Sequence, residues 1–272
     1  MTLSVAIGGF GAIGKVVARR LDRRLDRGVA GLALVGVAAR DAARAERAMA
    51  DFARPVPVLP LTHLGEVADI VVECAPAHLL REIAEPALRH GRIVMVLSCG
   101  ALLDNFDLVD LARRHGGRIL VPTGALLGLD AVVAAAEGGI QSVTMITRKP
   151  PNGLVGAPYL ETNNIDITGL TEPKRVFSGT ARDAARGFPA NVNVAAALAL
   201  AGIGPDRTRI EIWADPTVTR NIHRIEVEAD AARLSMQIEN VPSAENPRTG
   251  RLTPLSVIAA LKKLASPLAI GT

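Results

Sequence analysis

A glycine-rich turn near the start of the chain is the feature that most restricts its fold. Residues 3–8, LSVAIG, have the pattern of a short apolar strand, and residues 9–14 then read GFGAIG ahead of a helical pattern. A G-x-G-x-x-G motif between a strand and a helix is the context in which this motif binds a dinucleotide. Its glycines allow a tight turn and a close approach of the pyrophosphate, and the helix N-terminus offers N–H groups to the phosphates. The candidate cofactor-binding residues of the turn are Gly9, Gly11, Ala12, Ile13 and Gly14.

Apolar strand patterns recur through the first half of the chain and alternate with helical patterns. We expect strands within residues 3–8, 32–39, 67–75, 91–99 and 118–123. Strands that are apolar throughout, with helices between them, are typical of a parallel sheet covered on both faces. Residues 1–123 are therefore predicted to form a doubly wound, Rossmann-type α/β domain.

The pattern changes in the second half of the chain. Alternation of polar and apolar residues, typical of antiparallel strands, occurs at residues 141–150, 207–215, 220–230 and 233–240. Residues 151–180 are rich in Pro, Gly, Asn and Thr, and we expect them to be irregular. The sequence thus predicts a second α+β domain with a mainly antiparallel sheet at residues 124–245. A C-terminal segment follows at 246–272, and its helix is a candidate to pack back on the first domain.

Composition argues against several classes of function. The net charge of +4 comes from basic residues interleaved with acids, and one Trp and one Tyr offer few surfaces for stacking bases, so we expect no nucleic-acid partner. No apolar run reaches the ~20 residues that span a bilayer, and the start lacks the pattern of a signal peptide. The two cysteines do not suggest disulfides, which favours a cytoplasmic protein, and they have no metal-ligand spacing with the histidines.

The end of the second expected strand lacks the acid that normally binds the ribose 2′-hydroxyl of NAD. This segment reads VGVAARD, with Arg40 just past the strand and Arg44 one helical turn further on. An arginine at this place can bind the 2′-phosphate of NADP through paired, charge-assisted hydrogen bonds. We therefore expect NADP to be accepted at least as well as NAD. The alternative is that Asp41 turns back to the ribose instead of capping the next helix, and that Arg40 points to water.

One histidine lies in the middle of a strand pattern. In the segment RNIHRIEVEA, His223 shares a face with Ile225 and Val227, and this face has the character of a buried one. Two interpretations are open: a core histidine bonded to a backbone carbonyl, or an acid–base group, for which an imidazole has a suitable pKa. Cys99, at the end of an expected parallel strand, is a weaker candidate for a nucleophile, because no paired base is apparent.

The chain resembles the L-aspartate dehydrogenase family in segments that span nearly its whole length. These segments are GGFGAIG, VPTGALLGLDA, TRKPP, FPANVNVAAALALAGIGPDRT, ADPTVTRNIHRIEVEA and ENVPSAENPRTGRLTPLS. The resemblance implies a Rossmann domain, a second domain that forms a homodimer, and a cofactor that is NADP or NAD. It also implies oxidative deamination of L-aspartate to oxaloacetate and ammonia through iminoaspartate, the reverse reductive amination, and a supply of iminoaspartate to NAD biosynthesis.

The resemblance also assigns roles to individual residues. The catalytic histidine falls on His223, and nicotinamide contacts fall on Ala125 and on one asparagine of NVNV, either Asn191 or Asn193. A dicarboxylate substrate needs cationic or polar partners as well. The candidates for substrate binding are Arg148, Lys149, Asn221 and Arg224.

Two other functions stay open at this point. A semialdehyde dehydrogenase would use Cys99 as a nucleophile that forms an acyl intermediate. A non-catalytic redox sensor would bind NAD(P) without turning over any amino acid, since the same fold serves binding and catalysis.

Overall fold

The computed structural model describes residues 2–22, 29–189, 192–243 and 250–271. Contacts within the chain divide it into two compact units. Residues 1–122 together with 254–270 form unit 1, and residues 123–253 together with 271–272 form unit 2. Among the helices of the described residues, none has the length and apolar character that a membrane span requires.

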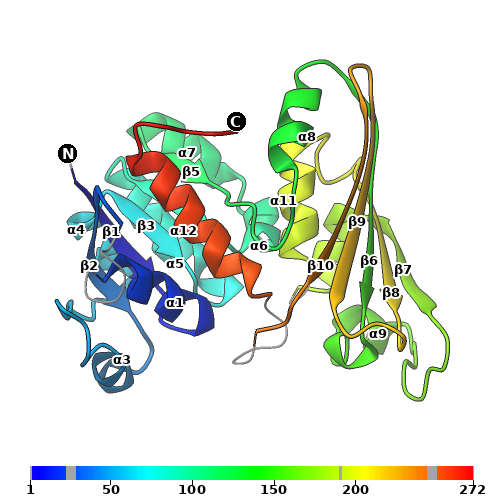
Figure 1. Ribbon diagram of the computed structural model, residues 1–272, viewed down its shortest axis with the longest axis horizontal. Coiled ribbons are helices and arrows are strands. Elements are labelled where there is room, and N and C mark those ends of the chain that lie inside the picture. The colour runs from blue at the N-terminus through cyan, green and yellow to red at the C-terminus, as the bar shows by residue number, and fades with distance from the viewer. Residues whose placement is uncertain (1, 23–28, 190–191, 244–249, 272) are drawn as a thin grey trace. The chain divides into compact units, whose positions relative to one another are not determined.

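Unit 1 is built on a five-stranded sheet with the strand order β2-β1-β3-β4-β5 (Figure 1). Its strands are β1 (Leu3–Gly8), β2 (Leu32–Ala38), β3 (Ile70–Glu73), β4 (Ile93–Val96) and β5 (Arg118–Leu120). All of their pairings are parallel, which confirms the predicted doubly wound sheet. The order of the strands reverses at β1, because β2 lies on one side of it and β3, β4 and β5 follow on the other. Ligands of such sheets bind at the carboxyl ends of the strands at this point.

Helices connect the strands of unit 1. They are α1 (Ala12–Leu21), α3 (Ala42–Ala48), α4 (Leu64–Val67), α5 (Leu80–Arg89), α6 (Cys99–Asp104) and α7 (Asp107–His115), with 3-10 turns at Leu61–His63 and Ala77–Leu79. Helix α1 begins inside the glycine motif, because Gly11 is its N-cap. The first turn of α1 therefore faces the carboxyl ends of β1 and β3.

The C-terminal helix α12 (Leu252–Ala265) belongs to the core of unit 1. Its Val257 and Leu261 are fully buried in one apolar cluster with Val5 and Ile7 of β1. Burying a side chain of this size contributes about 1.5–3 kcal/mol. The end of the chain is thus an integral part of the unit that contains the glycine turn.

Unit 2 is built on a five-stranded mixed sheet with the strand order β10-β9-β6-β8-β7 (Figure 1). Its strands are β6 (Ile140–Lys149), β7 (Lys174–Thr180), β8 (Arg209–Ala214), β9 (Asn221–Ala229) and β10 (Arg233–Asn240). Three pairings are antiparallel and β6 pairs with β8 in parallel, which confirms the predicted mainly antiparallel sheet. Strand β6 ends at Lys149, directly before two prolines that cannot donate to a ladder.

Strand β7 and helix α9 (Pro158–Thr162) lie in the segment that the sequence predicted to be irregular, so that prediction was wrong. The pairing of β7 with β8 shifts between Arg175 and Phe177, and Val176 and Phe177 are buried as neighbours. This irregularity removes the alternation of polar and apolar residues that reveals a strand.

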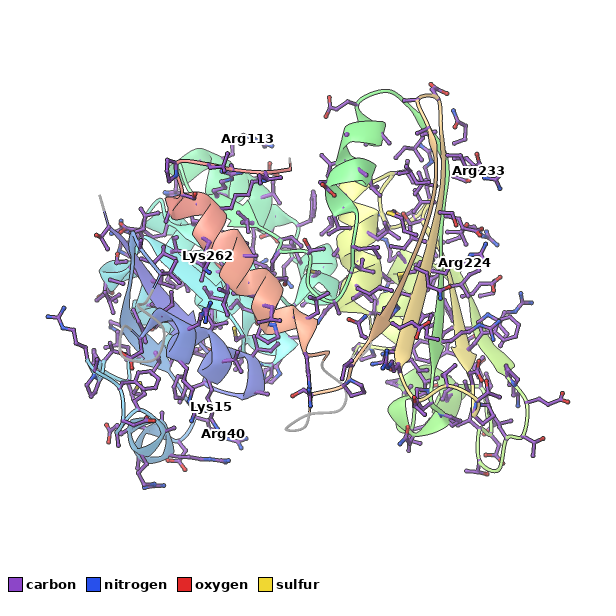
Figure 2. All side chains as sticks on the ribbon, in the orientation of Figure 1. Lys15, Arg40, Arg113, Arg224, Arg233 and Lys262 are labelled. Carbon is purple, nitrogen blue, oxygen red and sulfur yellow. The ribbon has the colours of Figure 1, made fainter. Side chains whose placement is uncertain are left out.

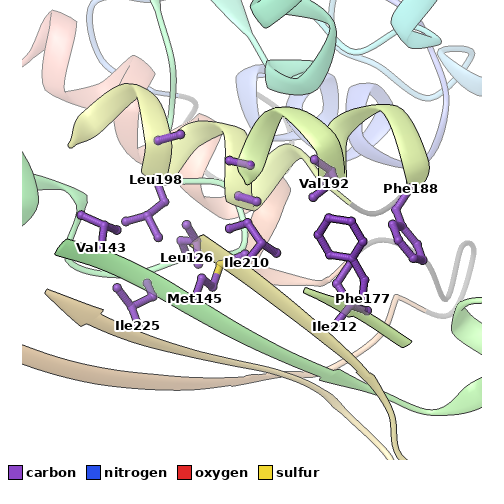
Figure 3. Close-up of a cluster of buried hydrophobic side chains, with 14 of the residues drawn as sticks. Leu126, Val143, Met145, Phe177, Phe188, Val192, Leu198, Ile210, Ile212 and Ile225 are labelled. Atoms are coloured by element: carbon purple, nitrogen blue, oxygen red, sulfur yellow. The ribbon is translucent and has the colours of Figure 1, made fainter. Parts of the chain in front are cut away.

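Helices α8 (Leu129–Ala136), α10 (Ala181–Gly187) and α11 (Asn193–Ala201) pack against one face of this sheet. Figure 3 shows Leu198 of α11 over Val143 and Met145 of β6, with Ile225 of β9 in the same cluster. We call this buried face of the sheet the inner face of unit 2. Its apolar core ends toward the carboxyl end of β6, where polar residues replace the aliphatic ones.

Candidate active site

The glycine turn of unit 1 has the shape of a phosphate-binding loop. Gly9 has a φ of +107°, and a Cβ there would lie 2.6 Å from the carbonyl oxygen of Cys74 after β3. A Cβ on Gly14 would lie 2.1 Å from the carbonyl oxygen of Gly9, so the first and third glycines are required by packing. A Cβ on Gly11 would have no atom of the described residues within 4 Å. The turn is therefore tight on its inside and open at Gly11, where a pyrophosphate would approach α1, and these residues fit a dinucleotide.

The end of β2 lies beside this turn. Gly8 pairs with Ala38, and the N–H of Gly9 donates to the carbonyl oxygen of Ala38 at 3.0 Å. Arg40 follows two residues later, is exposed, and lies with Lys15 of α1 at this end of unit 1 (Figure 2). The carboxylate of Asp41 accepts a hydrogen bond from the backbone N–H of Arg44 at 2.9 Å. Asp41, which is also exposed, is thus engaged as the N-cap of α3, and the first charged residue beyond β2 is the exposed Arg40.

A buried acid that sequence reasoning missed braces the same edge of the sheet. Glu73, the last residue of β3, is fully buried and accepts hydrogen bonds from the N–H groups of Leu97 and Ser98 at 3.0 and 2.8 Å, and from the Ser98 hydroxyl at 2.9 Å. Burial raises the pKa of Glu73, and the Ser98 bonds oppose this rise. The loops after β3 and β4 are therefore held together beside the glycine turn.

Cys99 does not have the environment of a catalytic nucleophile. It is the first residue of α6, it is buried, and its Sγ lies 3.7 Å from the carbonyl oxygen of Val96. Burial, followed by the nearby negative charge of Glu73, raises the pKa of the Cys99 thiol to about 12. The thiolate needed for attack is therefore scarce at neutral pH.

We expect a Cys99→Ala variant to keep kcat within about threefold of the wild-type value, because the side chain acts only as a small buried apolar group. Steady-state assays of the two proteins, after thermal unfolding has shown equal stability, provide the comparison. A loss of kcat as large as about 100-fold in the folded variant would show that Cys99 takes part in catalysis.

In unit 2, His223 lies on the inner face at its polar end. It is 3% exposed, and the pairing of β9 with β6 places it opposite Thr147. Its Nδ1 lies 3.0 Å from Oγ1 of Thr147, so its partner is a side-chain hydroxyl rather than a backbone carbonyl. When Nδ1 donates this bond, Nε2 keeps a lone pair with which to accept a proton.

The same face brings together further polar residues. Lys149, the next inward-facing residue of β6 after Thr147, is 5% exposed, and burial lowers its pKa to about 8. Asn221 is buried two positions before His223 and pairs with Asn240 of β10. The amide of Asn240 donates to the carbonyl oxygen of Ala125 at 2.8 Å. We call Thr147, Lys149, Asn221, His223 and Asn240 the polar patch.

Both arginines that the sequence suggested for substrate binding lie away from His223. Strand alternation places Arg148 and Arg224 on the face opposite His223. Arg148 donates to the buried Asp215 at 3.0 Å and lies 5.0 Å from the centre of the Trp213 ring. Arg224 is exposed and forms an ion pair with Glu226 at 2.7 Å. The structure thus brings Lys149 and Asn221 to the histidine and leaves these two arginines out.

The asparagines expected near the nicotinamide are placed only in part. Asn193 is exposed and is the first residue of α11. Asn191 lies outside the described residues. Thr147 and Asn240 escaped sequence reasoning, because their relation to His223 and Ala125 depends on strand register.

Comparisons with known proteins decide the family. A family model described as aspartate dehydrogenase, C-terminal, matches residues 130–264, and one described as homoserine dehydrogenase, NAD binding domain, matches residues 9–122. The L-aspartate dehydrogenase of Bradyrhizobium diazoefficiens is 61% identical over 99% of this chain and 94% of its own length. The chain belongs to the L-aspartate dehydrogenase family.

Other relatives of the L-aspartate dehydrogenase family agree with this assignment. L-aspartate dehydrogenase 3 of Bordetella bronchiseptica is 58% identical, over 99% of this chain and 98% of its own length. The crystal structure of aspartate dehydrogenase from Thermotoga maritima shares the fold, with a TM-score of 0.74, 23% identity and full coverage of both chains. The chain is therefore an oxidoreductase, and its NAD-binding domain implies NAD or NADP as the cofactor.

Proposed function

We propose that this enzyme oxidises L-aspartate to iminoaspartate, which water converts to oxaloacetate and ammonia, and that it also runs the reverse reductive amination. The observation that carries the proposal is the polar patch, where a buried neutral imidazole lies near a buried lysine. Burial, followed by the positive charge of Lys149, lowers the pKa of His223 to about 3. The imidazole is therefore neutral before substrate binds, as a general base must be.

A bound NAD or NADP would supply the acceptor for the hydride that leaves Cα of the amino acid, and the substrate ammonium group loses one proton as the C=N bond forms. Water must then add to the imine carbon, and His223 accepts the proton that this water loses. The same imidazole returns a proton to the amine as ammonia leaves. Thr147 orients the ring through Nδ1, and Lys149 and Asn221 are the groups of the polar patch that we assign to the substrate.

Two groups of residues are assigned to the cofactor. Gly9, Gly11, Ala12, Ile13 and Gly14 would hold the pyrophosphate at the first turn of α1. The nicotinamide would contact Ala125, whose carbonyl group Asn240 fixes, and one of Asn191 and Asn193. Iminoaspartate that leaves before hydrolysis would feed NAD biosynthesis. A homodimer in the cytoplasm, as the resemblance implies, remains a prediction that sedimentation and cell fractionation would test.

The direct test is a product analysis with purified enzyme, L-aspartate and either NAD or NADP. We expect oxaloacetate, ammonia and reduced cofactor in equal amounts, and oxaloacetate with ammonia to oxidise the reduced cofactor. Cofactor binding without turnover would instead support the redox sensor. Reaction only with an aldehyde would support a semialdehyde dehydrogenase.

We expect NADP to serve at least as well as NAD, because the first charged residue beyond β2 is the exposed Arg40 and the carboxylate of Asp41 is engaged as a helix cap. A charge-assisted hydrogen bond contributes roughly 1.5–3 kcal/mol. An Arg40→Ala variant should therefore bind NADP about 10- to 100-fold more weakly and NAD about equally. Measuring kcat/KM for both cofactors tests this, with Arg47→Ala, an exposed arginine of α3, as the matched control. A strong preference for NAD that the Arg40 substitution leaves unchanged would contradict the assignment.

A further inference from the structure

The buried acid Glu73 occupies a central place at the carboxyl edge of the sheet of unit 1. It is the last residue of β3, and its side chain is fully buried. In the ladders it pairs with Gly8 of β1 on one side and with Val96 of β4 on the other. Gly8 directly precedes the glycine turn, and Val96 directly precedes the loop after β4. Glu73 therefore lies between two loops at the edge where ligands of such sheets bind.

The groups around the Glu73 carboxylate all donate hydrogen bonds to it. Oε2 accepts from the N–H groups of Leu97 and Ser98 at 3.0 and 2.8 Å, and Oε1 accepts from the Ser98 hydroxyl at 2.9 Å. The backbone N–H of Ala75, in the loop after β3, also binds this carboxylate. An ionised carboxylate has only acceptors to offer, so it matches this set of donors. One side chain thus ties together the backbones of both loops.

The loop after β3 lies in turn against the glycine turn. The N–H of Cys74 donates to the carbonyl oxygen of Gly8 at 2.7 Å. A Cβ on Gly9 would lie 2.6 Å from the carbonyl oxygen of Cys74 and 2.7 Å from the nitrogen of Ala75. Because the backbone of Gly9 packs directly on this loop, a shift of the loop would be transmitted to the first glycine of the motif.

We propose that Glu73 is a positioning residue for the cofactor, whose carboxylate fixes the loops after β3 and β4 against the glycine turn. The proposal rests on the cofactor site proposed above and deepens it. Binding is tighter when the groups that meet a ligand are held in place beforehand, because less order has to be imposed on binding. Loss of the carboxylate should therefore raise the Kd for the cofactor and leave the chemical step nearly unchanged.

Asp22 offers a matched comparison within the same unit. It is also a buried acid, and its two oxygens accept from the backbone N–H of Ala53 at 3.1 and 3.0 Å. Asp22 is the C-cap of α1, so it lies at the end of this helix that is remote from the glycine turn. If Glu73 served only the stability of the fold, removing either carboxylate would have the same kind of effect. A positioning role predicts that only Glu73 changes cofactor binding.

The test measures cofactor binding apart from turnover. Glu73→Gln keeps the size of the side chain, but it removes the charge and replaces one acceptor oxygen by an amide nitrogen that cannot accept. Ser98→Ala removes only the hydroxyl bond and leaves the backbone bonds to the carboxylate in place. Asp22→Asn makes the same chemical change as Glu73→Gln at the control site. Fluorescence titration with NADPH and with NADH gives Kd, and thermal unfolding without cofactor gives the melting temperature.

In Glu73→Gln we expect Kd for both reduced cofactors to rise at least about 10-fold, since charge-assisted hydrogen bonds are lost. Ser98→Ala should raise Kd about three- to 10-fold. In the double variant the rise should be smaller than the product of the two single rises, because both changes remove one shared contact. Asp22→Asn should keep Kd within about twofold, whatever its melting temperature.

Steady-state kinetics add a readout that a purely structural role would not move. KM for the cofactor should rise with Kd in Glu73→Gln, while kcat at saturating cofactor and KM for L-aspartate stay within about threefold. Glu73 is not among the residues that we assign to the reaction, so the effect should be confined to the cofactor. If Glu73→Gln does not fold, the Kd of Ser98→Ala decides.

Wild-type Kd in a folded Glu73→Gln, or in Ser98→Ala where only that variant folds, would overturn the proposal. An equal rise of Kd in Asp22→Asn would do so as well, because it would show a general loss of stability. Gly11→Ala separates this failure from a failure of the proposed cofactor site. If Gly11→Ala weakens the cofactor and the Glu73 and Ser98 variants do not, only the role of Glu73 is wrong.

Discussion

Replacing His223 by alanine is expected to lower kcat by about 10²- to 10⁴-fold, the range that a positioned acid–base group contributes. The Kd for the cofactor should change little, because His223 is not among the residues that we assign to the cofactor. The variant also removes the hydrogen-bond partner of Thr147 on a buried face, so its fold must be checked by thermal unfolding. Steady-state kinetics and fluorescence titration of the reduced cofactor give the two quantities.

His115→Ala is the matched control for this experiment, since His115 is exposed at the end of α7. We expect it to have wild-type kinetics. A folded His223→Ala enzyme with near-normal kcat would mean that the histidine is a structural core residue. That result would remove the acid–base role from the mechanism.

The glycine turn gives a second large effect, in which two similar substitutions should behave differently. A Cβ on Gly11 meets no described atom, so Gly11→Ala should fold normally and yet place a methyl group where the pyrophosphate approaches. Two charge-assisted hydrogen bonds lost at about 1.5–3 kcal/mol each correspond to a rise in the cofactor Kd of about 100-fold or more. The melting temperature should stay close to that of wild type.

Gly14→Ala should weaken both the cofactor and the fold. Its Cβ would lie 2.1 Å from the backbone oxygen of Gly9, a contact that forces the turn to move, and overpacking of this kind costs about 1–3 kcal/mol. Gly138→Ala, where the nearest atom is 3.7 Å away, is the control for both variants. Wild-type cofactor affinity in Gly11→Ala would show that the pyrophosphate does not bind at this turn.

The fold was predictable from the sequence where a segment is apolar throughout or where its polar and apolar residues follow one clear period. The parallel strands of unit 1 are apolar on both faces, so they were recognisable without knowledge of their neighbours. The sequence likewise left Asp41 two local roles, as the N-cap of the next helix or as a partner of the ribose, and the structure has it as the N-cap. Strand β7 was missed because a register shift puts Val176 and Phe177 side by side in the core, which breaks the alternation.

The site was less predictable, because its members are joined by strand register and not by sequence spacing. His223 was a candidate from its own strand, but its partner Thr147 is 76 residues away. Lys149 and Arg148 look equally suitable in the sequence, and only the direction of their side chains in β6 separates the buried lysine from the half-exposed arginine. Glu73 was passed over because an acid at the end of an apolar strand has no recognisable partner until the loop after β4 is placed.

The measurement that tests the central claim most directly is kcat/KM of the purified enzyme for L-aspartate, L-glutamate, L-alanine and D-aspartate, with NAD and with NADP. We predict that L-aspartate gives the highest value with whichever cofactor is preferred, and that the other three fall at least about 100-fold below it, since a missing or misplaced charged partner costs about 3 kcal/mol. Faster turnover of L-alanine or L-glutamate than of L-aspartate would contradict the account.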